Sequence, residues 1–325
     1  MDYRNKAVLA PMVRIGTLPM RLLAIRYGAD LVYSPEIIAH RLAKCTRVVN
    51  GMHRLIAEKL STVDFVDPAG TLALRVHPSE QARLIVQIGS ADPLLALLAA
   101  RKVESDVAGI DLNCGCPKRF SVQGGMGSAL LETPDILMAV LESLVQNLSI
   151  PVTCKIRLLC EKAGLSASER TILLLQRIEA TGVKAIGIHA RFTHERPREP
   201  AHWKYFETLS RAISIPIIAN GDIYSLRDAK ELTSMAEKIT SFMFARAAQN
   251  NPSVFREDGP LPYRIVMLEY LKLGIQFDMR YDNIKYALLQ MGYPEDEKVE
   301  FKQKMIRCKT ISELLDLVEG AQLEE

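Results

Sequence analysis

Eight short apolar runs along the first 245 residues constrain the fold of this chain more than any other feature of its sequence. Each run consists mostly of Val, Ile, Leu or Ala and lacks alternating polar residues, which is typical of parallel strands buried on both faces. In chain order the runs are KAVLA, DLVYS, LIVQIG, VAGIDL, PVTCKI, AIGIHA, IPIIAN and SFMFA. Helix-like stretches lie between them, at residues 18–27, 93–104, 134–146, 169–181, 203–212 and 225–236 among others.

Strands and helices that alternate in this way predict an α/β fold. Eight βα units in about 250 residues match the size of a closed (β/α)8 barrel, the TIM barrel, and an open doubly wound sheet is the alternative. After residue 255 the pattern changes to apolar residues at helical spacing with charged residues between them. We therefore predict a (β/α)8 barrel over residues 1–250, followed by a small all-α helical domain over residues 256–325.

Composition narrows the class of protein. Hydrophobic residues make up 48% of the chain, enough for a large core. We find no secretory signal and no apolar stretch near the roughly 20 residues that cross a bilayer, so we expect a soluble, cytoplasmic protein with no membrane partner. Six cysteines are too few and too irregularly spaced for a disulfide scaffold, so we expect reduced thiols.

The charge is unevenly distributed along the chain. Residues 1–255 contain 31 Lys and Arg against 24 Asp and Glu, whereas residues 256–325 contain 10 against 14. The basic excess on the larger part favours a phosphate-bearing or polyanionic partner there, although an ordinary solvated surface explains the figure equally well.

Polar or turn-forming residues stand at the end of every apolar run. They are Pro11, Met12 and Val13 at the first, Glu36 at the second, Gln87 at the third, Asn113 and Cys116 at the fourth, Lys155 and Arg157 at the fifth, His189 and Arg191 at the sixth, Asn220 and Gly221 at the seventh, and Ala245 and Arg246 at the eighth. Because the carboxyl ends of barrel strands meet at the face that carries catalytic groups, we expect these side chains to surround one cavity. Each taken alone also has a structural explanation, such as a turn or a hydrogen-bonded core histidine.

The last two strand ends indicate what occupies that cavity. Phosphate sites in such barrels are commonly built by the loops after strands seven and eight. The residues Asn220, Gly221, Asp222, Ala245 and Arg246 fit that arrangement. A cation and an amide, at positions 155 and 87, suit the N1/O2 edge and the pyrimidine ring of a flavin. FMN is favoured over a dinucleotide, because no GxGxxG motif follows the first run.

Two cysteines, Cys114 and Cys116, flank a glycine directly after the fourth run. A CxC pair lacks the usual spacing of metal ligands, so we predict no metal site. A nucleophilic thiol needs an activating base, which the sequence does not identify. A thiol also serves as a proton donor, and Cys116 suits that role because the glycine-rich loop PKRFSVQGGMGSALL follows it.

Several ordered motifs make this chain resemble the tRNA-dihydrouridine synthases. They are APM at residues 10–12, the NxGCP box at 113–117, GGMGSAL at 124–130, VTCKIR at 152–157, HxR at 189–191 and NGD at 220–222. The stretches APMVRIGTLPMR, ADLVY, STVDF, AGIDLN and YDNIKY are most similar to the eukaryotic cytoplasmic branch, which is assigned to uridine 20 of tRNA. The resemblance extends over about residues 9–286.

The resemblance implies a specific enzyme. It implies an FMN-binding catalytic barrel and a helical tRNA-binding domain that together reduce uridine to 5,6-dihydrouridine in the D-loop of tRNA, with NADPH as reductant. Hydride would pass from N5 of FMN to C6 of uracil, and Cys116 would give a proton to C5. The residues implied to hold FMN, with Asp222 added from its place in the phosphate motif, are Pro11, Met12, Val13, Gln87, Lys155, His189, Asn220, Gly221, Asp222, Ala245 and Arg246. Asn113 and Arg191 would contact the flipped uracil, with Lys155 and His189 nearby.

Two features depart from the family pattern. Position 114 is usually a larger apolar residue, and the cysteine here is expected to place two thiols near the site and expose it to oxidative inactivation. Animal members often add a double-stranded-RNA-binding domain after the helical one, and the sequence given contains none. Binding of tRNA is then expected from the barrel, from the helical domain, where Arg280, Lys285 and Arg307 are candidates, or from partners or residues outside this sequence.

Two other functions remain possible from the residues alone. One is a lyase in which Lys155 forms a Schiff base. The other is a tRNA-binding module without chemistry, which predicts salt-sensitive RNA binding that persists without flavin.

Overall fold

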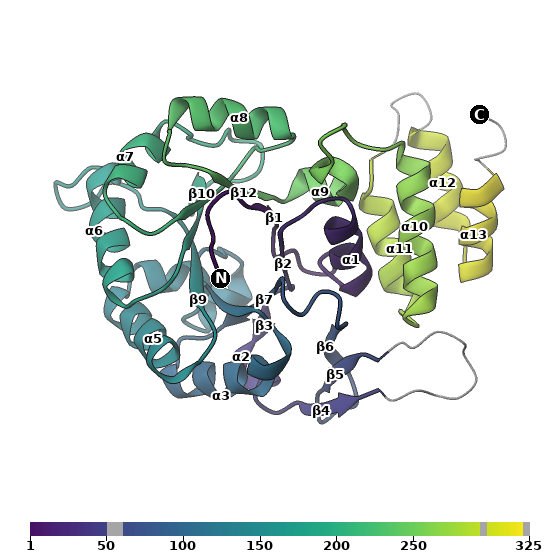
Figure 1. Ribbon diagram of the computed structural model, residues 1–325, viewed down its shortest axis with the longest axis horizontal. Coiled ribbons are helices and arrows are strands. Elements are labelled where there is room, and N and C mark those ends of the chain that lie inside the picture. Colours follow the sequence, from purple (N-terminus) through teal and green to yellow (C-terminus); the bar gives the residue numbers. More distant parts are fainter. Residues whose placement is uncertain (51–60, 293–297, 321–325) are drawn as a thin grey trace.

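The computed structural model describes residues 1–50, 61–292 and 298–320, and within them eight parallel strands close into a barrel (Figure 1). The strands are β1 (Ala7–Leu9), β2 (Leu31–Tyr33), β7 (Leu84–Gly89), β8 (Gly109–Asn113), β9 (Val152–Leu158), β10 (Ile186–Phe192), β11 (Ile217–Asn220) and β12 (Ser241–Phe244). The order β2-β1-β12-β11-β10-β9-β8-β7 is closed by pairing of β2 with β7. The predicted barrel is confirmed, and the open sheet is excluded.

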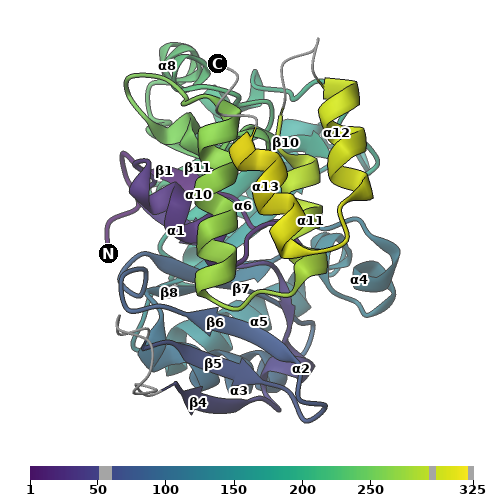
Figure 2. The ribbon, with the colours of Figure 1, turned by 90° about the vertical axis from the view of Figure 1, so that its right-hand side faces the viewer.

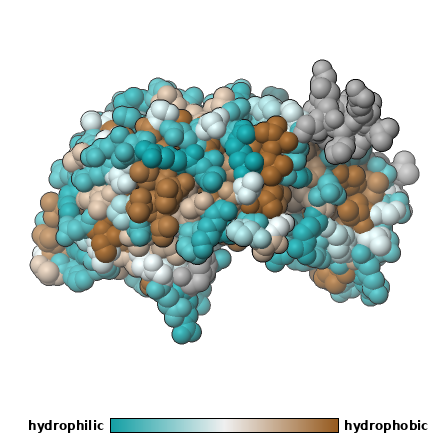
Figure 3. Space-filling view, turned by 90° about the horizontal axis from the view of Figure 1, so that it is seen from below, coloured by the Kyte–Doolittle hydropathy of each residue, from teal (hydrophilic) through white to brown (hydrophobic). Residues whose placement is uncertain are grey.

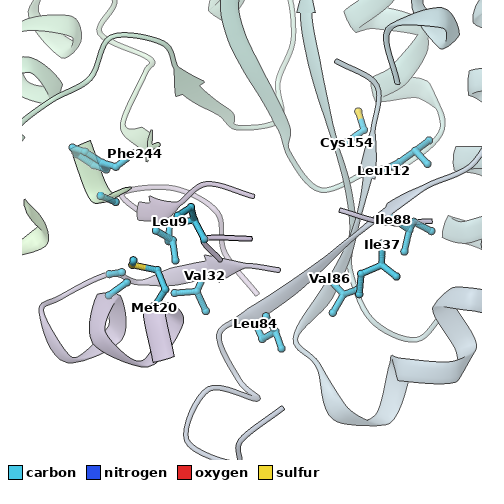
Figure 4. Close-up of a cluster of buried hydrophobic side chains, with 14 of the residues drawn as sticks. Leu9, Met20, Val32, Ile37, Leu84, Val86, Ile88, Leu112, Cys154 and Phe244 are labelled. Carbon is cyan, nitrogen blue, oxygen red and sulfur yellow. The ribbon is translucent and has the colours of Figure 1, made fainter. Parts of the chain in front are cut away.

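Burial on both faces explains why the strands read as continuous apolar runs. Along β1, Leu9 belongs to a large cluster that packs against the surrounding helices (Figure 4), whereas Val8 belongs to a smaller separate cluster with Leu31, Ile85 and Met243. Successive side chains of a strand point to opposite faces, so the smaller cluster fills the barrel interior. With apolar side chains on both sides of the sheet, no polar alternation is left in the sequence.

Helices follow the strands at the predicted places. The barrel helices are α1 (Leu18–Arg26), α3 (Pro93–Val103), α5 (Pro134–Asn147), α6 (Ala167–Ala180), α7 (Tyr205–Arg211), α8 (Leu226–Met235) and the short α9 (Arg246–Asn250). Local signals fix several starts: the Asp92 side chain accepts hydrogen bonds from the first turn of α3, and Ser166 and Ser225 form capping boxes at α6 and α8.

An insertion between β2 and β7 is absent from the sequence-based prediction. It contains β3 (Ile37–Ile38), which pairs with β7, the short helix α2 (Ala39–Leu42), and an antiparallel sheet of β4 (Thr46–Val49), β5 (Val63–Val66) and β6 (Leu72–Val76). The sheet lies beside the barrel and below the C-terminal helices in Figure 2. Its arginine, Arg75, pairs with Asp64 at 2.6 Å and also donates a hydrogen bond to the carbonyl of Phe277.

In the described part of residues 256–320, four helices follow the barrel: α10 (Tyr263–Gln276), α11 (Tyr281–Gln290), α12 (Lys298–Arg307) and α13 (Ile311–Gly320). They stand side by side next to α1 and α9 (Figures 1 and 2). Glu269 of α10 accepts hydrogen bonds from Arg26 and Tyr27 of the barrel, each at 2.9 Å. One hydrophobic cluster continues from the barrel helices into α10 and α11, so the two parts pack as one body. The division at residues 250 and 256 stays a prediction.

The outer surface carries hydrophobic side chains in separate patches among hydrophilic ones, as seen from below in Figure 3. Among the helices in the described ranges, none combines the length and apolarity needed to cross a membrane.

Candidate active site

A cavity of about 350 Å³ lies at the carboxyl ends of the barrel strands. Twelve of the residues singled out from the sequence line it: Pro11, Met12, Val13, Glu36, Gln87, Asn113, Cys116, Lys155, Arg157, His189, Asn220 and Ala245. Its size falls within the usual range for small-molecule sites, which is about 300–1,000 Å³. Residues far apart in the sequence therefore meet around one space, as the barrel geometry predicted.

The floor of the cavity is a buried hydrogen-bonded network centred on Asp111 of β8. Its carboxylate accepts hydrogen bonds from Gln87 Nε2 at 2.8 Å and from Thr153 Oγ1 at 2.7 Å. Burial raises the pKa of Asp111 to about 6, although the two donors and the Lys155 charge oppose the shift. Because a carboxylate can only accept hydrogen bonds, it fixes the Gln87 amide with its NH2 group toward Asp111. This leaves Oε1 of Gln87 as an acceptor for the cavity.

Lys155 of β9 brings a positive charge to the cavity wall. Its ammonium makes no hydrogen bond or ion pair with any residue in the described ranges. Burial, followed by the charge of Arg157, lowers the pKa of Lys155 to about 8, and Asp111 and Cys116 oppose this shift. Gly187 of β10 leaves space for the lysine stem, since a Cβ there would lie 3.1 Å from Lys155 Cγ. An unpaired ammonium in such surroundings favours a ligand with electron-rich atoms.

His189 of β10 is held in its neutral form. Burial, and then the charges of Lys155, Arg157, Arg191 and Arg246, push its pKa far below the usual value. Nη1 of Arg191 lies 3.0 Å from Nε2 of the imidazole. Since a guanidinium can only donate, Nε2 is the acceptor and the ring proton sits on Nδ1.

Arg191 does not line the cavity, and its assignment to substrate binding stays a prediction. The residue is 2% exposed, and its donors go to His189, to the Glu199 carbonyl at 2.7 Å and to both oxygens of Asp222 at 2.6 Å. Arg191 thus orients the imidazole from its buried side.

The predicted phosphate motif forms one connected group beside the cavity. Asp222 is paired with Arg191 and also with the half-exposed Arg246. Gly221 has φ of 118°, and a Cβ there would lie 3.1 Å from the His189 ring and 3.0 Å from Ala201.

Cys116 sits on a loop whose shape is set by Asn113. The Asn113 Oδ1 accepts hydrogen bonds from the backbone N–H of Gly115 at 3.0 Å and of Cys116 at 3.2 Å. The glycine-rich segment after it packs on this loop: Ser128 N–H donates to the Cys116 carbonyl at 3.0 Å. Gly127, at φ 58°, approaches so closely that a Cβ would lie 2.5 Å from that carbonyl. The segment thus supports the half-buried thiol from one side.

The Cys114 thiol, expected near the site, does not line the cavity. Its side chain is fully buried, and it contacts the Leu112 carbonyl at 3.5 Å. Burial and the neighbouring Cys154 raise the pKa of Cys114 well above its usual value. A protonated thiol inside the core is protected, so oxidation through Cys114 is not expected.

Several cavity residues were not assigned from the sequence. Ala10, Ile15, Gly115, Pro117, Lys118, Gln249 and Tyr286 also line it. Glu36 Oε1 is buried without a hydrogen-bond partner among the described residues, and burial raises the pKa of Glu36. Glu36 and Arg157 were expected at the cavity from their strand ends but were given no role there. Tyr286 comes from α11 and ends the YDNIKY stretch, which marked the resemblance but no place at the cavity.

Of the helical-domain cations suggested for RNA, Lys285 has another role. Its ammonium donates to the carbonyls of Ile306 and Cys308, both at 2.7 Å, at the end of α12. Arg280 is exposed and 3.4 Å from Asp282, and Arg307 is exposed.

Comparison with known proteins gives consistent matches. A family model described as dihydrouridine synthase (Dus) matches residues 8–265. The chain is 45% identical over 299 residues to a tRNA-dihydrouridine(20) synthase, NAD(P)+, of Schizosaccharomyces pombe, covering 90% of this chain and 60% of that protein. It is 40% identical to the protein of the same name in Saccharomyces cerevisiae, covering 97% and 83% of the two chains. A human protein named tRNA-dihydrouridine(20a/20b) synthase, NAD(P)+-like, is 30% identical over 90% of this chain and 84% of its own.

Proposed function

The chain belongs to the dihydrouridine synthase family, and from that premise we propose that it reduces uridine to 5,6-dihydrouridine at position 20 in the D-loop of cytoplasmic tRNA. NADPH is the proposed reductant, in keeping with the names of the relatives in the two yeasts. The observation that carries the proposal is the convergence of Cys116, Lys155, Gln87 and His189 on one cavity.

The donor set of the cavity fits FMN. Gln87 offers an acceptor oxygen whose direction is fixed by Asp111, and Lys155 offers an unpaired ammonium. Asn220 donates through Nδ2 to the Met243 carbonyl at 2.9 Å, which leaves its Oδ1 as a further acceptor. An acceptor, a cation and an amide around a flat cavity match the polar edge of a flavin pyrimidine ring. We propose that these residues hold that ring, with Pro11, Met12, Val13 and Ala245 as apolar and backbone contacts.

The phosphate of FMN would bind near Gly221 and Arg246, with Asp222 as a positioning residue. Arg246 and Arg191 both pair with Asp222, and Arg246 is the half-exposed one of the two, so it retains donors for a phosphate. Arg191 holds Asp222 and His189 in place from the buried side. A guanidinium held by a carboxylate is already oriented, so less entropy is lost when it binds an anion.

When bound, FMN would supply the hydride that its N5 delivers to C6 of the uracil. The chain itself would supply the proton for C5, and Cys116 is the proposed donor, because its thiol lines the cavity on a loop braced by Asn113 and Gly127. Asn113, His189 and Lys155 would bind the edges of the base. The base must leave its stack to enter, at a free-energy cost that pairing with these groups offsets in part.

The two alternative functions have less support. The relatives' names describe synthases, which favours chemistry over an RNA-binding module without catalysis. A Schiff-base lyase would use the lowered pKa of Lys155, yet it leaves the buried Gln87–Asp111 network and Cys116 without a task.

The test uses purified protein and tRNA from a strain that lacks dihydrouridine. The protein is expected to show a flavin absorption spectrum, to oxidise NADPH and to raise the dihydrouridine content of this tRNA. A matched tRNA with cytidine at position 20 is the control and should gain none there. Colourless protein that does not take up added FMN would overturn the proposal, and dihydrouridine at another position would overturn the assignment to position 20.

A further inference from the structure

An arginine and a tyrosine from opposite ends of the chain form a stacked pair at the opening of the cavity. The guanidinium carbon of Arg14 lies 3.7 Å from the centroid of the Tyr286 ring. Val13 and Ile15, on either side of Arg14, line the cavity, and so does Tyr286. Of the lining residues, Tyr286 is the one that comes from the described part of α10–α13.

The guanidinium of Arg14 has its N–H donors available. Arg14 is exposed, and within the described ranges no hydrogen bond or ion pair to its side chain is found. The arginines Arg21 and Arg191, by contrast, use most of their donors on protein acceptors. A guanidinium that stacks through its face keeps the donors at its edge, and these match the oxygens of a phosphate.

The backbone of Arg14 is in an unfavourable conformation. Its φ is 67°, in the left-handed region, within a turn where the Met12 carbonyl accepts hydrogen bonds from Ile15 N at 3.1 Å and Gly16 N at 2.8 Å. Glycine is the residue that tolerates this conformation best. Strained backbone at such a position is commonly found where function requires the side chain.

We propose that the Arg14–Tyr286 pair binds the sugar-phosphate backbone of the tRNA at the target nucleotide, while the base enters the cavity. This inference rests on the proposed function. A flipped base remains attached to its own phosphates, which must then lie at the opening, where Arg14 and the exposed Lys118 are found. The larger, barrel-containing part of the chain also carries the excess of basic residues.

The Arg14–Tyr286 pair also joins the barrel to the helical part of the molecule. Tyr286 belongs to α11 and Arg14 to the loop after β1, so a phosphate bound at the edge of the stacked guanidinium lies where the helical part meets the barrel. NADPH carries phosphates as well, and the experiment must separate this second source from RNA.

The experiment compares the full chain with an Arg14→Gly variant. Glycine removes the guanidinium and relieves the left-handed backbone, so the thermal midpoint should stay equal or rise. Affinity for tRNA at low salt should fall about tenfold, as expected for one lost charge-assisted contact. The slope of log K against log salt concentration should decrease by about 0.7–0.9, which corresponds to one phosphate. The flavin spectrum and the KM for NADPH should not change.

Three matched variants make the result specific. Arg101→Ala removes an exposed arginine of α3 that does not line the cavity, and it should leave tRNA affinity unchanged. Ala163→Gly relieves the left-handed backbone at another residue, where φ is 52°, without removing a charge. Its thermal midpoint therefore shows how much stability the backbone change alone adds. Arg14→Lys keeps the charge and should retain the salt slope while it weakens binding less than glycine does.

Each outcome decides one point. If the unaltered chain reduces tRNA and Arg14→Gly binds tRNA with the same affinity and salt slope, the inference is wrong although the proposed function stands. A rise in the KM for NADPH with tRNA affinity intact would assign the phosphate to the nucleotide cofactor and also overturn the inference. If the unaltered chain carries flavin but never reduces tRNA, the proposed function fails independently of Arg14.

Discussion

The floor and the opening of the cavity are built on different physical principles. At the floor, Gln87, Asp111 and Thr153 are buried and joined by hydrogen bonds of 2.7–2.8 Å. At the opening, Arg14 and Lys118 are exposed cations. A buried network fixes the direction of each donor and acceptor, whereas exposed cations attract any nearby polyanion.

This difference separates the two tasks of the proposed enzyme. The floor would select a flat cofactor by geometry, and its binding should depend little on salt. The opening would select RNA by charge, and its binding should weaken steeply as salt rises. Substitutions at the floor should therefore change stability and cofactor affinity together, while those at the opening should change RNA affinity alone.

The largest expected effect lies between the two regions, at Cys116. A Cys116→Ala variant should retain flavin and oxidise NADPH, yet reduce tRNA about 10²–10⁴-fold more slowly, the range for loss of a general acid. Single-turnover measurement of tRNA reduction by pre-reduced enzyme gives this rate directly. Cys160→Ala alters another partly buried cysteine, outside the cavity lining, and serves as the control. Equal rates for Cys116→Ala and the unaltered chain would remove Cys116 from the chemistry.

The next effect concerns the centre of the floor. The pKa of Asp111 is about 6 in the folded chain and 3.8 for the free side chain, so folding favours the protonated carboxyl group. The free energy of unfolding therefore decreases as the pH rises from about 4 to 6. Asp111→Asn stays neutral, so at pH 7 it should be more stable than the unaltered chain by on the order of 3 kcal/mol, with the difference vanishing below about pH 4.

The same variant should bind FMN less tightly. With an amide at position 111, either Gln87 or Thr153 must reverse its hydrogen bond, which disturbs the acceptor that Gln87 presents to the cavity. Urea unfolding at several pH values and FMN titration of the apoprotein measure the two effects. A variant that loses stability at pH 7, or that binds FMN as before, would show that Asp111 does not organise the floor.

The contrast between floor and opening also explains what the sequence could predict. The floor residues stand on strands, and continuous burial makes those strands visible as apolar runs, so Gln87, Asn113 and Lys155 could be placed in one cavity. Tyr286 could not, because the YDNIKY stretch shows a resemblance but not that α11 packs against the barrel mouth, which depends on contacts between distant segments.

Side-chain partners and partly exposed strands account for what else the sequence did not show. The HxR motif does not reveal the acceptors of Arg191, whose guanidinium contacts the His189 ring at 3.0 Å and donates to both oxygens of Asp222. The sheet of β4, β5 and β6 was missed because its strands are not buried on both faces: β4 is exposed throughout, and β5 and β6 carry the ion pair of Asp64 and Arg75, so no continuous apolar run marks them.

A smaller effect is expected from the pH dependence of cofactor binding. The pKa of Lys155 is lowered to about 8, so its ammonium is mostly protonated at pH 7 and mostly neutral at pH 9. If this charge contacts the polar edge of FMN, the affinity of the apoprotein for FMN should fall about tenfold over that interval. Fluorescence titration of FMN measures it, and Lys155→Met should bind more weakly throughout and show a flat profile. An unaltered chain with the same affinity at both pH values would exclude a charge contact.

The smallest effect tests whether the cations of the helical part resemble those of the opening. The Lys285 ammonium caps α12 by donating to the carbonyls of Ile306 and Cys308. Lys285→Met should therefore lower the free energy of unfolding by about 0.5–1 kcal/mol, the usual value of a cation at a helix C-terminus. The salt slope of tRNA binding should stay unchanged, in contrast to Arg14→Gly. A decrease of the slope by about 0.7–0.9 in Lys285→Met would mean that RNA draws the ammonium away from α12, and charge-based binding would then extend from the opening into the helical part.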